Sequence, residues 1–107
     1  MPRYLAQVAY TADAWKTQIG HPVDPHDRVG PAVAALGGSI ECIYYAFGEY
    51  DVVAIFDLPD NASAAALALA VGSTGAISKY HTTPLLTIDE GLAAMGKAAS
   101  TGYRPPG

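Results

Sequence analysis

His81 is the residue of this sequence best suited to acid–base chemistry. It lies between Tyr80 and Thr82, near the end of a predicted strand. An imidazole can take up or release a proton near neutral pH, so His81 could act as an acid or a base. The simpler interpretation is a histidine on an edge strand that faces solvent or a neighbouring subunit. The alternation does not decide on which side of the sheet His81 lies. Ile77 favours the side covered by helices, but Lys79 and His81 have the same parity along the strand as Ile77.

A second group of polar residues, His21, Asp24, His26 and Asp27, falls within one short segment. Histidine and aspartate can both bind metal ions, but this spacing matches no standard ligand motif. Asp24 is also followed by Pro25, which is the pattern of a helix N-cap with proline at the first helical position. We therefore expect linker residues here and no metal site.

Other reactive signatures are missing from the sequence. Cys42 is the single cysteine, so an internal disulfide is excluded, and we expect it to be a small buried thiol on the helix side of the sheet. The sequence has no glycine-rich phosphate loop, no serine nucleophile elbow and no CxxC pair. We therefore predict no cofactor and find no self-sufficient catalytic set.

The length and composition indicate one small domain that associates with copies of itself. The 107 residues support a single domain over residues 1–100, followed by a Gly/Pro-rich tail over residues 101–107. Half of the residues are hydrophobic and only 15% are charged, and a small domain has little interior in which to bury such a surplus. We expect the excess to lie at an interface of a homodimer or a higher homo-oligomer.

Charge and hydropathy argue against two classes of partner. The net charge is −4 and the six Lys and Arg residues are scattered, so no basic surface predicts nucleic-acid binding. The longest apolar stretch, residues 64–71, is too short to cross a membrane. The opening residues lack the features of a signal peptide, and we expect a cytoplasmic protein.

Alternation, caps and glycines predict the elements that position these residues. Strands are expected at 3–10, 40–47, 51–56 and 76–82, the last continuing through Pro84 as an edge strand. Helices are expected at about 12–19, 25–36, 62–71 and 88–99, with N-caps at Thr11, Asp24, Asp60 and Thr87. This order predicts an α+β, ferredoxin-like β-α-β-β-α-β fold with a four-stranded antiparallel sheet, helices on one face and a C-terminal helix.

Strict alternation divides the sheet residues between its two faces. We assign Tyr4, Ala6, Val8, Ile40, Cys42, Tyr44, Val52, Ala54 and Phe56 to the helix side. The open side then receives Leu5, Gln7, Ile43, Tyr45, Phe47, Val53, Ile55 and Asp57. Because that side is largely apolar, we predict that two sheets pack face to face. Polar groups buried in such a seam must pair across it, hold water or hold a ligand.

The segment Phe47-Gly48-Glu49-Tyr50-Asp51-Val52-Val53 resembles the signature of the GYD domain family, with Glu49 placed inside it. The resemblance extends over nearly the whole chain, through Pro2-Arg3-Tyr4-Leu5, Asp27-Arg28, Leu36-Gly37-Gly38 and Leu58-Pro59-Asp60. It implies a small bacterial protein of the dimeric α+β barrel type and no agreed activity. In physical terms we expect Gly48 to take a positive φ, Asp51 to accept backbone N–H bonds and Tyr50 to cover the sheet end.

Three functions remain open at this point. The leading hypothesis is a domain for small-ligand binding or assembly, with a small organic ligand held in the seam by Gln7, Tyr45, Phe47, Asp57 and His81. The alternative, by fold analogy, is a cofactor-independent enzyme of the monooxygenase or isomerase kind, with His81 or Asp57 as base and Tyr45 as donor. The third is a purely structural homo-oligomer without a pocket.

Overall fold

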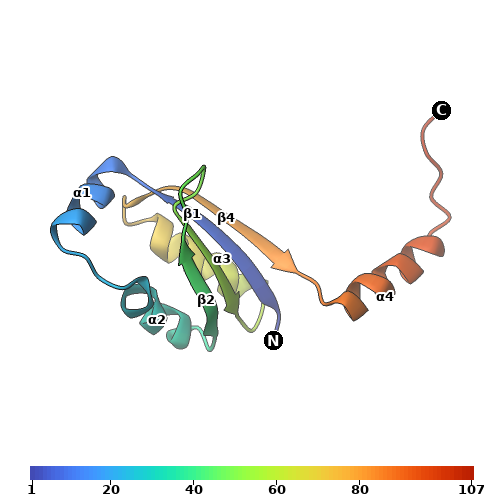
Figure 1. The fold of residues 1–107 in the computed structure, drawn as a ribbon. Helices are drawn as coiled ribbons and strands as arrows, with labels where there is room; N and C mark the ends of the chain where they lie inside the picture. Colours follow the sequence, from blue (N-terminus) through green and yellow to red (C-terminus); the bar gives the residue numbers. More distant parts are fainter.

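The computed structural model describes all residues from Met1 to Gly107 as an α+β chain with an open four-stranded sheet (Figure 1). The elements follow in the order β1 (Arg3–Tyr10), α1 (Ala12–Gly20), α2 (Pro25–Ala35), β2 (Ser39–Tyr45), β3 (Val52–Asp57), α3 (Asn61–Gly72), β4 (Ile77–Leu85) and α4 (Ile88–Ala99). The predicted α+β, ferredoxin-like class is confirmed. None of the four helices combines the length and the apolar character needed to span a bilayer.

The sheet has the strand order β2-β3-β1-β4, and every neighbouring pair is antiparallel. β1 therefore lies inside the sheet, with Leu5 opposite Ile55 of β3 on one side and opposite Thr83 of β4 on the other. Pro84 lies on the edge strand β4, as expected from its missing N–H.

A bulge in β2 overturns part of the predicted division between the faces. Ile40 lies opposite Phe56, but Cys42 lies opposite Ile55, so one extra residue interrupts the alternation. The prediction was therefore wrong for the strand residues from Cys42 onward. Cys42 and Tyr44 lie on the open side, and Ile43 and Tyr45 lie on the helix side.

A second bulge, at Ser78, decides the orientation of β4. Tyr10 lies opposite Ile77, whereas Ala9 lies opposite Lys79, and Ser78 is the extra residue between them. Its hydroxyl donates to the carbonyl oxygen of Ala9 at 3.2 Å. The bulge places Ile77 on the helix side and His81 on the open side, which settles the face that the alternation alone left undecided.

The core lies between the sheet and the two helices that pack on it. α2 packs against β2 and α3 packs against β4, which covers one face of the sheet. The buried cluster comprises Tyr4, Ala6, Val33, Ala54, Phe56, Leu58, Ala64 and Leu67. The Tyr4 hydroxyl donates to Asn61 Oδ1 at 2.7 Å, which ties β1 to the first turn of α3.

The predicted helix caps are all present. Asp24 and Asp60 accept backbone N–H bonds from His26 and Ser63, and these bonds hold the pKa of each carboxyl below its usual range. Thr87 and Glu90 form a reciprocal capping box at the start of α4, which lowers the pKa of Glu90 in the same way. The role of these polar residues is therefore to cap the N-termini of α2, α3 and α4.

α4 and the tail after it project away from the sheet and the other helices (Figure 1). The apolar side chains of α4 have no cover within the chain, since Ile88, Leu92 and Met95 are 80%, 59% and 69% exposed. Their spacing places them on one face of the helix. This face is a second apolar surface, besides the open side of the sheet.

Candidate functional site

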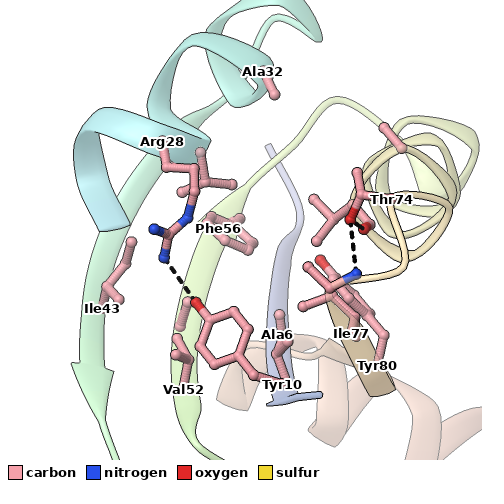
Figure 2. Close-up of a pocket in the computed structure, with 16 residues that line it drawn as sticks. Ala6, Tyr10, Arg28, Ala32, Ile43, Val52, Phe56, Thr74, Ile77 and Tyr80 are labelled. Carbon is pink, nitrogen blue, oxygen red and sulfur yellow. Dashed lines mark hydrogen bonds between the residues drawn. The ribbon is translucent and has the colours of Figure 1, made fainter. Parts of the chain in front are cut away.

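A cavity of about 280 Å³ lies on the helix side of the sheet, between α2 and α3 (Figure 2). Fourteen of the sixteen residues that line it are hydrophobic. Small side chains explain the space, because alanines come from β1, α2, β3 and α3 and from the turn before β4. These are Ala6, Ala32, Ala54, Ala70 and Ala76. Two helices held over such a surface cannot fill the gap between them.

Arg28 brings a positive charge to this cavity from α2. Its Nη2 group donates to the Tyr10 hydroxyl at 2.9 Å and to Gln18 Oε1 at 3.2 Å. Its guanidinium carbon lies 5.8 Å from the centre of the Tyr10 ring, within the range of a cation–π contact. Figure 2 shows the two side chains meeting at one side of the cavity. Both hydrogen-bond partners are neutral, and no carboxylate forms an ion pair with Arg28.

Tyr80 reaches the cavity from β4, where it lies opposite Val8. Burial raises the pKa of Tyr80 to about 12, and its hydroxyl makes no hydrogen bond within the chain. The phenol therefore stays protonated well above neutral pH and offers a donor to whatever enters the cavity.

We expect Tyr80 to make the fold more sensitive to alkali. The pKa of Tyr80 is about 12 in the folded chain, whereas an unfolded tyrosine titrates near about 10. Between these values the unfolded chain has lost a proton that the folded chain keeps, so stability is complete below the lower value and falls as pH rises toward the upper one. Tyr80→Phe should reduce that fall by about 1–2 kcal/mol between pH of about 9 and about 11, measured by urea unfolding. Equal losses in both proteins would contradict the burial of this phenol.

Asp51 holds the Tyr10 end of the cavity in place. Its carboxylate accepts the backbone N–H of Tyr10 at 2.9 Å and the indole N–H of Trp15 at 3.2 Å. The Trp15 ring then meets the Tyr10 ring edge-on at 5.2 Å. Asp51 accepts a backbone N–H as expected, but the donor belongs to β1 and not to the turn between β2 and β3. This carboxylate therefore positions the tyrosine to which Arg28 donates.

Gly48 and Tyr50, the other two residues of that turn with a predicted role, have different outcomes. Gly48 does not have a positive φ, so that prediction was wrong, and an added Cβ would meet nothing within 4 Å. Tyr50 lies against His81 with ring centres 6.5 Å apart, which places it beside the open side of the sheet.

The five residues predicted to hold a ligand do not meet within one chain. Gln7 and His81 are cross-strand neighbours on the open side. Asp57 lies on the same side near the other end of β3, where its carboxylate accepts from Arg3 Nε at 3.3 Å. Tyr45 is on the helix side with its ring 6.4 Å from that of Trp15, and Phe47 is fully exposed after β2. A ligand in the seam stays a prediction that needs a second copy.

Sequence reasoning missed the polar residues of the cavity, which are Tyr10, Arg28, Thr74 and Tyr80. One signal for Arg28 was present, because it lies four residues before Ala32 and so shares the face of α2 that turns toward the sheet. A charged residue on the apolar face of a helix lies either where that face meets solvent or at a ligand-binding site. No comparable signal singles out Tyr80.

Comparison with known proteins identifies the family of the chain. A family model described as GYD domain matches residues 4–95, which run from β1 into α4. The matched region contains all the residues that line the cavity. A search of curated proteins found no match.

Proposed function

The chain belongs to the GYD domain family, and from that premise we propose that it is a homo-oligomeric domain that binds a small, largely apolar molecule between α2, α3 and the sheet. The observation that carries this proposal is the cavity of about 280 Å³ with its largely hydrophobic lining. A concave apolar site with a few polar groups at fixed positions is typical of small-molecule binding. Arg28, Tyr10 and Tyr80 supply polar groups here. The Thr74 hydroxyl, which also lines the cavity, already donates to the Val71 carbonyl and accepts from the Ala76 N–H.

The cavity limits the size of the molecule. An apolar cavity of roughly 150 Å³ takes up benzene, and sites for drug-sized ligands begin at roughly 300 Å³. A volume of about 280 Å³ therefore suits one aromatic ring with a short substituent, or an aliphatic chain of similar bulk. Larger ligands would have to move α2 or α3.

Self-association is proposed from the surfaces that the chain leaves uncovered. Leu5, Val53 and Ile55 lie side by side on the open face of the sheet, and all three are only partly buried. Contiguous exposed apolar surface is unusual on a monomer and is typical of an interface. The apolar face of α4 adds a second surface of the same kind. A second copy would cover both, and a cytoplasmic location accords with such a protein.

The enzymatic alternative receives less support from the geometry. The lining of the cavity contains no carboxylate, histidine or cysteine that could serve as a base or nucleophile. On the open face, His81 lies opposite Gln7 and Asp57 lies opposite Arg3, four residues away along β1. Tyr45 lies on the other side of the sheet. Catalysis would therefore require groups from a second copy of the chain.

A cavity-filling substitution tests the proposal. Ala54 is buried on the floor of the cavity, so Ala54→Leu should fill part of it and weaken binding of a neutral probe, benzyl alcohol, by about tenfold or more. Binding would be measured from saturable amide shifts in proton–nitrogen NMR spectra. Ala65→Leu, on the exposed side of α3, is the matched control and should bind as the wild type does.

Two results would contradict the proposal. One is the absence of any saturable shift in the wild-type spectrum, and the other is unchanged binding by a well-folded Ala54→Leu variant. Should that variant lose its dispersed spectrum, Ala32→Leu fills the cavity from α2 instead, at a position that is only partly buried.

A further inference from the structure

We infer that the molecule bound in this cavity is a small organic acid whose carboxylate lies against Arg28 and Tyr10 and whose apolar body fills the space between α2 and α3. This inference rests on the proposed function and names the class of its ligand. It depends on the charge at one end of the cavity and on the unused hydrogen-bond donors around it.

The charge of Arg28 is unmatched where it lies. Arg3 and Lys79 both have carboxylate partners, Arg3 with Asp57 and Lys79 with Glu49. Arg28 instead donates to a phenol and to an amide oxygen, both neutral. A guanidinium at the edge of an apolar cavity, with no carboxylate of the chain within ion-pair distance, favours an anionic group on the ligand.

The donors that would bind a carboxylate are free. Only Nη2 of Arg28 is used within the chain, so the Nε and Nη1 groups keep their N–H donors. The Tyr10 oxygen accepts from Arg28, which leaves its own proton available for donation. Asp51 and Trp15 fix the position of Tyr10, so its hydroxyl is held in place before a ligand arrives. Guanidinium and phenol together present donors that suit the two oxygens of one carboxylate.

The rest of the cavity restricts the acid to a single charge. Beyond Arg28 the lining contains no other cation, so a second carboxylate or a phosphate would be buried without a partner. Tyr80 lies across the cavity from Arg28 (Figure 2), where its hydroxyl can donate to a neutral acceptor on the body of the acid. The chain also carries a net charge of −4, which disfavours polyanions in general.

Matched acid and amide probes test the inference. Phenylacetate and phenylacetamide have nearly the same shape, and only the first is charged at neutral pH. We expect the wild type to bind phenylacetate about tenfold or more tightly than the amide by isothermal titration calorimetry. Arg28→Gln should bring that ratio close to one and leave binding of the amide nearly unchanged. Lys16→Gln removes an exposed charge on α1 and should leave the ratio as in the wild type.

The results distinguish a wrong ligand class from a cavity that binds nothing. Equal binding of acid and amide by the wild type would overturn the inference while leaving a binding cavity intact. An unchanged preference for the acid in Arg28→Gln would place the carboxylate elsewhere and would also overturn it. Failure of both probes and of benzyl alcohol to bind would contradict the proposed function itself.

Discussion

Replacing Ile55 by lysine is expected to convert the proposed dimer into a folded monomer. Ile55 lies at the centre of the open face, opposite Leu5 of β1 and Cys42 of β2. If two sheets pack through this face, the substitution buries an unpaired ammonium group, which costs several kcal/mol of association free energy. In the monomer the same side chain reaches solvent, so the fold should be retained.

Size-exclusion chromatography with light scattering measures this effect directly. The wild type should elute with about twice the chain mass of 11.1 kDa, and Ile55→Lys with the mass of one chain. Ala65→Lys adds the same charge on the exposed side of α3 and should leave the dimer intact. An Ile55→Lys protein with the wild-type mass would place the interface on another surface, and the apolar face of α4 would be the next to test.

Replacing Gly38 by alanine is expected to destabilise the fold by about 3 kcal/mol or more. An added Cβ would lie 2.3 Å from the carbonyl oxygen of Asp57 and 2.6 Å from a methyl group of Leu58. The first of these atoms is backbone at the end of β3, and the second belongs to one of the most buried residues of the core. Neither can move without disturbing the contact between the end of α2 and the sheet.

Gly48→Ala provides the control for this prediction. Gly48 has neither a positive φ nor any atom within 4 Å of an added Cβ, so alanine should be neutral or slightly stabilising there. Urea unfolding of the two variants and the wild type gives the comparison. Similar free energies of unfolding for Gly38→Ala and Gly48→Ala would show that β3 does not approach Gly38 as closely as described.

The elements of this fold could be predicted because their local signals are strong. Four helix N-caps, at Thr11, Asp24, Asp60 and Thr87, stand where the sequence places them. The faces of β1 and β3 also follow from alternation, since both strands are regular. Alternation assigns side chains to the correct face only in a strand that contains no bulge residue.

The faces of β2 and β4 could not be predicted in full because each strand contains a bulge. One extra residue after Ile40 reverses the orientation of Tyr44 and Tyr45, and Ser78 does the same for the start of β4. No glycine or proline marks either position, so nothing local distinguishes the bulges from regular strand. The prediction therefore assigned Tyr45 to the seam, whereas the bulge places it on the side of the sheet where the cavity lies.

The cavity itself depends on distances between elements, which a single sequence does not contain. Its alanines are separated along the chain and each alone is compatible with a filled core. The space exists because α2 packs against β2 and α3 against β4, and the small side chains between them on β1 and β3, Ala6 and Ala54, do not fill it. The sequence therefore led to a ligand on the open face of the sheet, because alternation makes that face recognisable. It did not lead to the cavity between α2, α3 and the sheet.

Isotope-filtered nuclear Overhauser measurements test the central claim most directly, because they show which methyl groups touch a bound ligand. With labelled protein and unlabelled benzyl alcohol, the ring protons should give contacts to Val29, Val71 and Ile77, whose side chains line the cavity. Contacts to Leu5, Val53 and Ile55 alone would place the ligand in the seam between two sheets and would contradict binding between α2, α3 and the sheet.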